Sequence, residues 1–505
     1  MWNSMPRLLL PEEMREAEKR YMAENGIRSI DLMETAAGQL VSAMLEIAPD
    51  IRGRTVCFAC GPGGNGGDGC AAARLFASSF GRAAVLSPLG VEAARGDALV
   101  NLRRARETAG VAFVGMEGLD AIERPAMWVD AMFGIGLTRP LEGACARLAE
   151  RMARDRAQGS RVLAVDIPSG IHGGSGRDLG GAVAADFTVT FETAKTGHYL
   201  NDGLDACGAL TVRPIGLGGS VLPENAVRLI RRGDLALPRR PRNAHKGTFG
   251  HLLIVAGSLG MAGAACLCAR AALRSGAGLV SVACPSPIVP ILQAQAPGAM
   301  AIPLPDREGV VSPEAVPVLK QALSGKTALA VGPGLRRSAP PEIVETALRA
   351  ELPAVLDADA LNILADHPEL LPLLGPRHVL TPHPGEAARL LGRRVEDPVR
   401  DARALGAAGC VALLKGASSV IAGRHTSVST AGCCGMARGG SGDILTGMIG
   451  GMLAWGCPPE EAACLASEFH GMAGELAQKS LGPYAMAAED LLTCIPAVLS
   501  QCAIR

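Results

Sequence analysis

Asp443 stands in a glycine-rich stretch, MARGGSGDILTGMIGGML, where an apolar helix would begin. Gly439, Gly440 and Gly442 would leave backbone amides exposed at the start of that helix, and such amides bind anionic groups such as phosphate. The helix dipole stabilises a carboxylate in the first turn. A base beside a phosphate site is what deprotonation of a hydroxyl for attack on a nucleotide requires. The stretch predicts that Asp443 is a general base; an acidic helix cap is the simpler alternative.

Two further motifs in the second half of the chain carry residue types that suit the same chemistry. LLKGASSVIAG supplies Lys415, whose ammonium group could bind nucleotide phosphates. VLTPHPGEAARLL places His383 and Glu386 at a turn from a strand to a helix. Each residue taken singly is more often structural than functional, and it is their combination with GGSGD that indicates a nucleotide site.

The first half of the chain has a glycine-rich turn of its own, CGPGGNGGDG, from Cys60 to Gly69. It follows an expected strand and opens an expected helix, so its amides could point at a phosphate. It is not a P-loop, because no Gly-Lys-Ser/Thr follows, and it lacks the spacing of the dinucleotide fingerprint. Taken alone it is a weak indication of phosphate binding, with a structural tight turn as the alternative.

Polar side chains at further strand ends strengthen that indication. WVDAMFGIGLTRPLEG puts Asp130 at the end of one strand, and AVDIPSGIHGG puts Asp166 and Ser169 at the end of another. Ligands of open α/β sheets bind at the carboxyl ends of the strands, so these groups are expected to converge. Asn65, Asp130 and Ser169 offer hard oxygen ligands for an alkali cation, which leaves Asp166 for acid or base work. Helix or loop capping is the alternative for each aspartate taken alone.

The elements that must position these groups are predicted by short apolar runs that alternate with helical patterns. Continuous rather than alternating hydrophobicity favours parallel strands that are buried on both faces, and hence an α/β fold class. In the first half these runs cover residues 55–60, 82–88, 126–134, 161–168, 186–192 and 209–216, after two helices within residues 11–48. In the second half they cover residues 251–258, 278–286, 328–334, 353–359, 378–384 and 411–423.

The length of the chain, 505 residues, favours more than one domain. A Pro- and Arg-rich segment at residues 220–249 interrupts the alternation. We therefore predict two large α/β domains, residues 1–228 and residues 229–505.

Composition narrows the classes of partner. Lys plus Arg equals Asp plus Glu, at 49 each, so no net basic field attracts nucleic acid or an anionic membrane surface. No apolar run approaches the ~20 residues of a membrane span. The 15 cysteines are scattered through apolar runs, and the N-terminal segment lacks the pattern of a signal peptide, so we expect reduced thiols and a cytoplasmic location.

Residues 8–217 resemble the YjeF N-terminal family, the NAD(P)H-hydrate epimerases, through NGGDG, VDAMFGIGLTRPLEG, AVDIPSG and TVTFETAKTGHY. The resemblance implies a three-layer Rossmann-like domain that interconverts the R and S forms of NADH or NADPH hydrated at nicotinamide C6. It also implies that a potassium ion is held by Asn65, Asp130 and Ser169. The residues implied to contact the hydrated cofactor are Gly64, Asn65, Gly66, Gly67, Asp68, Gly134, Ile135, Gly136, Leu137, Thr138, Arg139, Pro140 and Asp166.

Three residues of this half bear on the implied reaction. Epimerisation needs an acid for the leaving hydroxyl and a base for the returning water, and Asp166 is the candidate for one or both roles. Lys195 is either its charge partner or a surface lysine. Gly64 departs from the family, which usually has an asparagine there, so this chain lacks one side-chain amide.

Residues 235–503 resemble the YjeF C-terminal family, the ADP-dependent NAD(P)H-hydrate dehydratases, which are related in fold to ribokinase. HKGTFG, VLDADALNIL, TPHPGE and GGSGDILTG carry the resemblance. Met261 departs from it, where an aromatic residue is frequent, and so does GPGLRRS, which adds positive charge. The residues implied to contact the hydrated nicotinamide nucleotide are Ala264, Gly334, His383 and Asp443. Those implied to contact the adenine nucleotide are Lys415, Gly416, Ala417, Ser418, Ser419 and Gly442.

The two resemblances together imply a bifunctional repair enzyme for NADHX and NADPHX, the hydrated cofactors. Asp443 would take the C6 hydroxyl proton, the oxygen would attack the terminal phosphate of ADP, and the ring nitrogen would expel phosphate, giving NAD(P)H, AMP and phosphate. The implied cofactors are ADP as co-substrate, a potassium ion and a magnesium ion, and the implied assembly is a homo-oligomer. Two alternatives stay open: a ribokinase-like kinase for a small molecule, and a nucleotide sensor without turnover.

Overall fold

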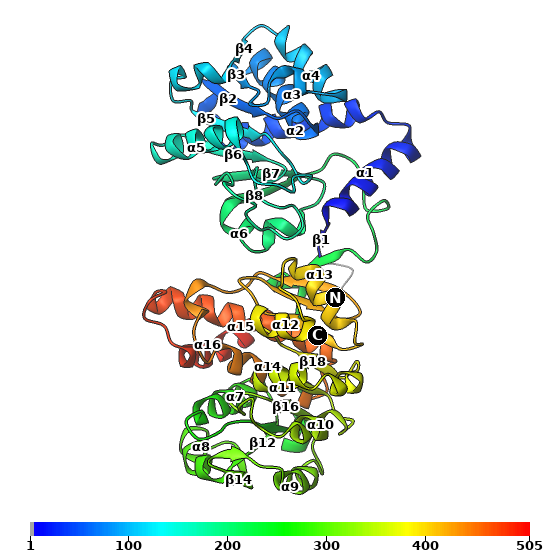
Figure 1. Cartoon of the computed structure of the whole chain (residues 1–505), viewed down its shortest axis with the longest axis vertical. Helices are drawn as coiled ribbons and strands as arrows, with labels where there is room; N and C mark the ends of the chain where they lie inside the picture. Colours follow the sequence, from blue (N-terminus) through cyan, green and yellow to red (C-terminus); the bar gives the residue numbers. More distant parts are fainter. Residues whose placement is uncertain (1–4, 505) are drawn as a thin grey trace. The chain divides into compact units, whose positions relative to one another are not determined.

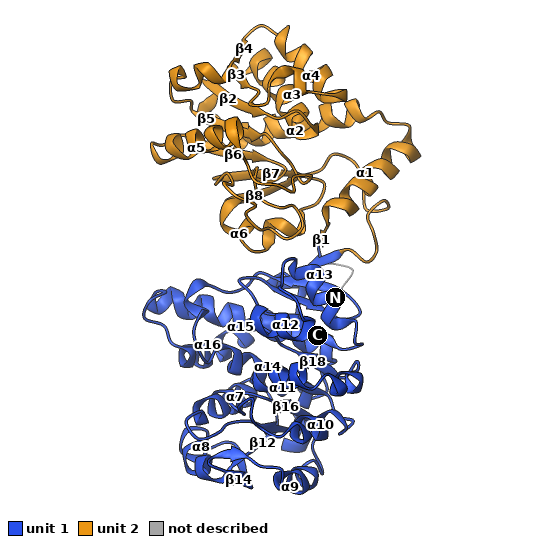
Figure 2. Cartoon of the chain, viewed as in Figure 1, with its two compact units in different colours: residues 1–6, 227–505 blue, residues 7–226 orange. Residues whose placement is uncertain are grey.

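The computed structural model describes residues 5–504, and its contacts divide the chain into two compact units (Figure 2). Arg7–Ala226 form one unit, called here the N-terminal unit. The described residues of Met1–Pro6 and Val227–Arg505 form the other, the C-terminal unit. The chain therefore passes from one unit to the other beside the predicted division at residue 228.

The N-terminal unit is built on a parallel sheet whose strands follow the order β4-β3-β2-β5-β6-β7-β8 (Figure 1). The order reverses direction between β2 and β5, which makes the carboxyl ends of these two strands the expected place for a ligand. The strands are β2 (Thr55–Cys60), β3 (Arg82–Leu86), β4 (Val111–Val114), β5 (Met127–Ala131), β6 (Arg161–Val165), β7 (Phe187–Phe191) and β8 (Ala209–Arg213). A short β1 (Arg7–Leu8) precedes them in the chain and is not part of this sheet.

Both faces of this sheet are covered, which explains why its strands are continuously apolar. Val56 and Phe58 of β2 pack in a core with the first four helices, whereas Cys57 and Ala59 of the same strand pack in a second core with α5. The unit therefore has three layers. Its helices are α1 (Pro11–Asn25), α2 (Ser29–Ile47), α3 (Gly64–Ser79), α4 (Gly96–Arg106), α5 (Gly143–Ala157) and the short α6 (Gly203–Ala206).

The C-terminal unit contains a second large sheet, with the order β9-β21-β20-β19-β18-β17-β16-β11-β12-β13. From β19 to β13 all neighbours are parallel, whereas β20 runs antiparallel to both of its neighbours. The strands are β9 (Val227–Leu229), β11 (His251–Val255), β12 (Leu279–Pro285), β13 (Met300–Leu304), β16 (Ala328–Val331), β17 (Ala354–Leu356), β18 (His378–Leu380), β19 (Val411–Leu414), β20 (Ser419–Ala422) and β21 (Thr426–Ser429). Two short pairs join β10 (Ala236–Leu237) to β22 (Ala503–Ile504) and β14 (Asp306–Arg307) to β15 (Val310–Val311).

Helices cover both faces of this sheet as well, with separate cores on the two sides. One layer consists of α7 (Ala262–Arg274), α8 (Val289–Gln295), α14 (Ser441–Ala454), α15 (Pro459–Leu481) and α16 (Ala488–Ser500). The remaining helices are α9 (Ala315–Ala322), α10 (Pro341–Leu348), α11 (Asp359–Asp366), α12 (Pro384–Leu391) and α13 (Pro398–Gly406).

Small residues fix the position of α14, the helix that carries Asp443. A Cβ added at Gly447 would overlap the carbonyl of Cys268, and one added at Gly451 would lie 2.8 Å from the carbonyl of Ala272. The backbones of α14 and α7 can therefore approach closely only because these positions are glycine. The glycines in the second half of the quoted stretch are thus explained by packing, and those before Asp443 remain to be explained by the site.

The predicted fold class, two three-layer α/β domains, is confirmed by these two sheets. The helices formed by residues 5–504 are each too short or too polar to span a lipid bilayer.

Candidate functional site

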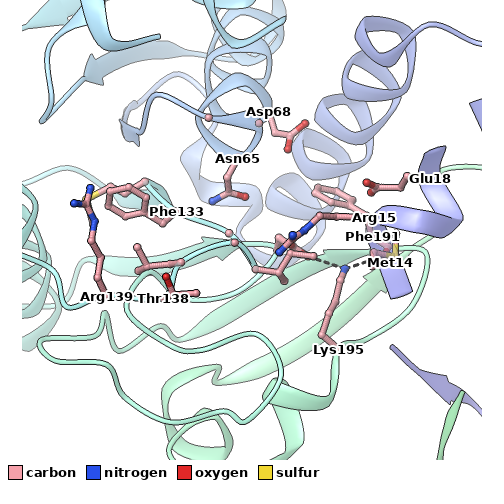
Figure 3. Close-up of a pocket in the computed structure, with 18 residues that line it drawn as sticks. Met14, Arg15, Glu18, Asn65, Asp68, Phe133, Thr138, Arg139, Phe191 and Lys195 are labelled. Carbon is pink, nitrogen blue, oxygen red and sulfur yellow. Dashed lines mark hydrogen bonds and ion pairs between the residues drawn. The ribbon is translucent and has the colours of Figure 1, made fainter. Parts of the chain in front are cut away.

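A cavity of about 550 Å³ opens at the carboxyl ends of β2, β5, β6 and β7 in the N-terminal unit, where the strand order reverses (Figure 3). Of the predicted cofactor contacts, ten line it: Gly64, Asn65, Asp68, Gly134, Ile135, Gly136, Leu137, Thr138, Arg139 and Asp166. The other lining residues are Met14, Arg15, Glu18, Gly63, Met132, Phe133, Phe191 and Lys195.

Three predicted contact residues, Gly66, Gly67 and Pro140, are not among the lining residues. A Cβ at Gly66 would overlap the backbone of Gly61, and one at Gly67 would lie 2.7 Å from the side chain of Met33. These glycines allow the start of α3 to pack closely against its surroundings, which is a sufficient reason for their residue type.

Asp166 follows β6 and is held in a strained, strongly bonded position. Its φ of 65° lies in the left-handed region, which is unusual for an aspartate. Its Oδ1 accepts hydrogen bonds from Lys195 Nζ at 2.7 Å and from Thr190 Oγ1 at 2.9 Å. Burial alone would raise the pKa of the Asp166 carboxyl, but the charge and hydrogen bond of Lys195 outweigh it, so the pKa lies below its ordinary value. The site therefore holds an ionised carboxylate, and Lys195, only 1% exposed, is its charge partner and not a surface lysine.

His198 supports Asp166 through the backbone. Burial, together with the charge of Lys195, lowers the pKa of His198 to about 4, so the ring is neutral at pH 7. Its Nδ1 accepts from the backbone N–H of Lys195 at 3.0 Å, which leaves the proton on Nε2 to be donated to the carbonyl of Asp166 at 2.7 Å. The ring thus joins the backbones of the two charged residues and stabilises the strained conformation.

Two further carboxyl groups face the cavity, Asp68 from α3 and Glu18 from α1 (Figure 3). Burial raises the pKa of Asp68 well above its ordinary value, and the nearby charges of Asp166 and Glu18 add to the effect. Burial also raises the pKa of Glu18, although Lys195 opposes the increase. No sequence pattern selects Glu18, because it lies in an ordinary amphipathic helix far from every motif.

The three residues predicted to hold an alkali cation are only partly joined by hydrogen bonds. Ser169 donates from its Oγ to Asp130 Oδ1 at 2.6 Å and from its N–H to Oδ2 at 2.7 Å, and burial raises the pKa of Asp130 to about 6. Among the described residues, the buried Nδ2 of Asn65 has no hydrogen-bond partner. Since the two ends of an amide are assigned from their partners, an oxygen at this position would be an unused ligand for a cation.

In the C-terminal unit Asp443 lies in the first turn of α14, whose N-cap is Gly440 with a φ of 98°. Burial raises the pKa of the Asp443 carboxyl to about 7, with a further increase from the nearby charge of Asp357 and an opposing effect of Lys415. The helix dipole was expected to keep this carboxylate ionised, but desolvation has the larger effect on its pKa. A carboxyl that titrates near neutral pH is well suited to act as a base.

A buried polar network lies beside Asp443. Asp357, which follows β17 and is 1% exposed, accepts from Lys415 Nζ at 2.7 Å and from Thr446 Oγ1 at 2.6 Å. Glu386 Oε2 lies 3.9 Å from the same Nζ. Burial lowers the pKa of Lys415, but Asp357 and Glu386 outweigh it, and the net change is an increase. The lysine is therefore a fixed positive charge near Asp443.

Gly442 connects this network to the start of α14. A Cβ built at Gly442 would lie 3.4 Å from Lys415 Nζ and 3.7 Å from Asp357 Oδ2. The loop that follows Lys415 contains Ser418, whose buried Oγ has no partner among the described residues. Two of the segments predicted to contact the adenine nucleotide, 415–419 and the start of α14, therefore meet in the structure.

His383 has a structural role that the sequence left open. It is the N-cap of α12, where its Nδ1 accepts from the backbone N–H groups of Gly385 at 3.0 Å and Glu386 at 3.4 Å. Its side chain is still 51% exposed and therefore accessible to a ligand. Capping and substrate contact are therefore compatible for this residue.

The other predicted substrate contacts, Ala264 and Gly334, are neighbours. A Cβ at Gly334, where φ is 64°, would lie 3.1 Å from the Cβ of Ala264. The arginines of GPGLRRS are engaged with the protein: Arg336 donates to Ser258 Oγ and to the carbonyl of Leu259, and Arg337 pairs with Asp366. Met261 is 43% exposed at the start of α7.

A single methyl group at Gly442 is expected to weaken ADP binding. The Gly442→Ala variant narrows the space beside Lys415, and we expect the KM for ADP to rise about tenfold, equivalent to ~1.4 kcal/mol. Gly375→Ala is the matched control, because a Cβ there meets nothing within 4 Å. Steady-state kinetics with varied ADP measure the effect, and equal KM values for the two variants would show that no phosphate lies beside Gly442.

Comparisons with known proteins identify the family of each half of the chain. Residues 29–197 match the model of the YjeF-related protein N-terminus, and residues 252–497 match that of NAD(P)H-hydrate dehydratase. The bifunctional NAD(P)H-hydrate repair enzyme Nnr of Moorella thermoacetica is 36% identical, over 97% of this chain and 96% of that protein. The enzyme of the same name from Escherichia coli is 33% identical, over 97% and 93%.

A solved structure, the ADP/ATP-dependent NAD(P)H-hydrate dehydratase of Bacillus subtilis co-crystallized with ATP and Mg²⁺, is 31% identical to this chain. It covers 53% of this chain and 94% of its own, with a TM-score of 0.44. Because the full-length relatives extend over both units and exceed 30% identity, the chain belongs to the family of bifunctional NAD(P)H-hydrate repair enzymes.

Proposed function

We propose that the N-terminal unit epimerises the R and S forms of NADHX and NADPHX, and that the C-terminal unit dehydrates the S form at the expense of ADP. The single observation that carries the proposal is a pair of carboxyl groups whose pKa values are shifted in opposite directions. Asp166 is kept ionised in one cavity, whereas Asp443 titrates near neutral pH beside a fixed lysine in the other unit. Each pKa shift suits the proton transfer that the reaction in its unit needs.

The epimerase reaction opens and re-forms the C6–O bond of the hydrated nicotinamide. The ionised Asp166 carboxylate is placed to take a proton from the water that adds to C6, and Lys195 holds it in the charged form. The cavity of about 550 Å³ accommodates the nicotinamide and part of its ribose phosphate.

Asp130, Ser169 and Asn65 are the residues that would hold a potassium ion, and their oxygen-rich donor set fits it. The unpaired amide of Asn65 and the buried carboxyl of Asp130 are groups that a cation would satisfy. A bound cation supplies positive charge that favours ionisation of Asp130.

The dehydratase reaction begins when the Asp443 carboxylate takes the proton of the C6 hydroxyl group. The oxygen attacks the terminal phosphorus of ADP, and AMP leaves; the ring nitrogen then expels phosphate, and loss of a ring proton gives NAD(P)H. Lys415 neutralises charge on the phosphates, and the amides at the start of α14 bind the transferred group. Gly416, Ala417 and Ser418 of the loop and Ser419 at the start of β20 lie beside the nucleotide, while Ala264, Gly334 and His383 contact the nicotinamide.

A magnesium ion would supply further charge neutralisation on the diphosphate, and Glu386 and Asp357 are the carboxylates near that place. Both already interact with Lys415. No group of three or more His, Cys, Asp or Glu side chains suited to a metal occurs within residues 5–504, so the phosphates themselves would provide most of the ligands.

The rival function is a ribokinase-like kinase, which would use the same base but release a stable phosphorylated product. Incubation of the full chain with ADP and separately purified R and S hydrates distinguishes the two. We expect the near-ultraviolet absorbance of NADH to recover fully from both forms with ADP, and R and S to interconvert without ADP. Recovery from neither form, with a phosphorylated product of another small molecule, would favour the kinase. Binding without turnover would favour a sensor.

The remaining predictions concern assembly and location. We propose a homo-oligomer in the cytoplasm, where the pool of NAD(P)H is repaired, without nucleic-acid or membrane partners. Light scattering of the purified protein and fractionation of the cells test these two statements.

A further inference from the structure

The epimerase chemistry needs proton transfer on both faces of the nicotinamide ring. A hydroxyl that leaves C6 on one face must be protonated to depart as water, while the water that adds on the other face must lose a proton. Asp166, as an ionised carboxylate, can serve as the base on one face. A second group is required as the acid, unless the two steps share one residue that reaches both faces.

Other elements of the cavity wall than those of Asp166 supply such groups. Asp166 and Lys195 come from the carboxyl ends of β6 and β7. Glu18 and Asp68 come from helices α1 and α3, and Figure 3 shows them on those helices, across from Lys195. Carboxyl groups from two different walls therefore face one cavity.

Glu18 and Asp68 are not occupied by other interactions. Within residues 5–504, neither carboxyl has a hydrogen bond or ion pair to the protein, although both are half-buried. Burial of a carboxyl group costs solvation free energy, and a hydrogen-bond or ion-pair partner in the protein normally offsets that cost. A half-buried carboxyl that faces a cavity without such a partner therefore indicates that a ligand binds there. By contrast, Glu13 of the same helix caps it, accepting from the backbone N–H of Leu10 at 2.8 Å.

The backbone ties Glu18 to the rest of the site. The N–H of Leu9 donates to the carbonyl of Ala194 at 3.1 Å, and the N–H of Thr196 donates to the carbonyl of Leu9 at 3.1 Å. These bonds flank Lys195, so the segment that starts α1 is fixed to the backbone of the charge partner of Asp166. Met14 and Glu18, four residues apart on one face of α1, both line the cavity.

We propose that Glu18, together with Asp68, is the second acid and base group of the epimerase. The pair holds one proton and gives it to the C6 hydroxyl as the C6–O bond breaks and water leaves. The ring nitrogen lone pair then forms a C6=N1 iminium ion, which the two ionised carboxylates stabilise. Water adds to C6 on the opposite face and gives a proton to Asp166, which completes the other epimer. The reverse sequence returns the first epimer and the proton of the pair, so atoms and charge balance.

The charges around the pair support its role as an acid. Burial and the charge of Asp166 raise the pKa values of both Glu18 and Asp68, and Lys195 opposes the increase. Arg15 and Arg139 also line the cavity, and Arg15 partly offsets the effect at Glu18. The cavity therefore contains three carboxyl groups around one buried lysine, an arrangement that favours retention of a proton.

The test is steady-state epimerisation of purified R and S hydrates by the full chain without ADP. This inference depends on the proposed function. Glu18→Gln keeps the size of the side chain and its ability to donate a hydrogen bond but cannot transfer a proton. We expect kcat to fall at least ~100-fold with KM unchanged within about twofold, as for the loss of a general acid. Asp68→Asn is expected to lower kcat in the same way.

Glu16→Gln is the matched control, because Glu16 is exposed on the same helix and does not line the cavity. We expect wild-type kcat from it. Wild-type kcat in Glu18→Gln would overturn the proposal, and so would a loss that appears only as a raised KM, since that indicates binding or structure alone. If the wild-type chain does not interconvert the two hydrates, the epimerase assignment itself fails. ADP-dependent dehydration, measured in each variant, verifies that the chain is folded.

Discussion

Replacement of Asp443 by asparagine is expected to lower the rate of ADP-dependent dehydration by ~10²–10⁴-fold, the usual contribution of a general base. The amide cannot accept the proton of the C6 hydroxyl group, although it fills the same volume at the start of α14. Binding of ADP should change little, because Lys415 and Gly442 are retained. The measurement is the recovery of NADH from the S hydrate under saturating ADP.

The raised pKa of Asp443 gives this reaction a pH dependence of defined sign. The base must be ionised to work, so activity is present above about pH 7 and is lost as the pH falls through that value. Asp443→Asn should lower the dehydration rate and also remove the fall in activity on the acidic side of the pH–rate profile. Epimerisation by the N-terminal unit of the same variant is the internal control and should stay at the wild-type level. A variant that dehydrates at the wild-type rate would remove Asp443 from the chemistry.

Replacement of Lys195 by methionine is expected to destabilise the N-terminal unit by roughly 3–5 kcal/mol and to abolish epimerisation. Lys195 is almost completely buried, and its loss leaves the Asp166 carboxylate without a compensating charge. The pKa of Asp166 would then rise, because burial would no longer be opposed. Amide hydrogen exchange followed by mass spectrometry measures the effect. We expect protection to be lost in β6 and β7 of the N-terminal unit, with β16 of the C-terminal unit as the unchanged reference.

Two controls separate the buried ion pair from a general effect of the substitution. Lys19→Met makes the same change at an exposed position of α1 and should leave exchange unchanged. Asp166→Asn combined with Lys195→Met removes both charges and should recover part of the protection without restoring activity, since an uncompensated charge costs more than a missing pair. Equal protection in Lys195→Met and in the wild type would contradict the role assigned to the ion pair.

Much of the fold followed from local patterns in the sequence. The runs at residues 55–60, 161–168 and 251–258 are mainly apolar, and each contains a strand of a parallel sheet. Strands that are covered on both faces lack the polar positions that alternate along a half-exposed strand, so they can be recognised from the sequence. Strands β4 and β13 were not predicted. Both are partly exposed edge strands, and their mixed burial gives neither continuous hydrophobicity nor clean alternation.

The candidate sites divide in the same way. The GGSGD motif identified Asp443, because glycines and a carboxylate at a helix start carry their meaning within a few residues, whereas Asp68 of NGGDG was implied only by the family resemblance. Glu18 and Asp357 were not selected, since α1 and the end of β17 reach their sites only through tertiary packing.

The sequence by itself determined the fold class and the two families of motif, and it selected Asp166 and Asp443 as candidate acid or base groups, because these are properties of residue type and short-range spacing. Only the tertiary structure decided which of those carboxyl groups is ionised. A buried lysine lowers the pKa of Asp166, whereas burial beside Asp357 raises the pKa of Asp443. The free energy of a charge depends on the water that is excluded and the charges that surround it in three dimensions, and neither is encoded in the local pattern.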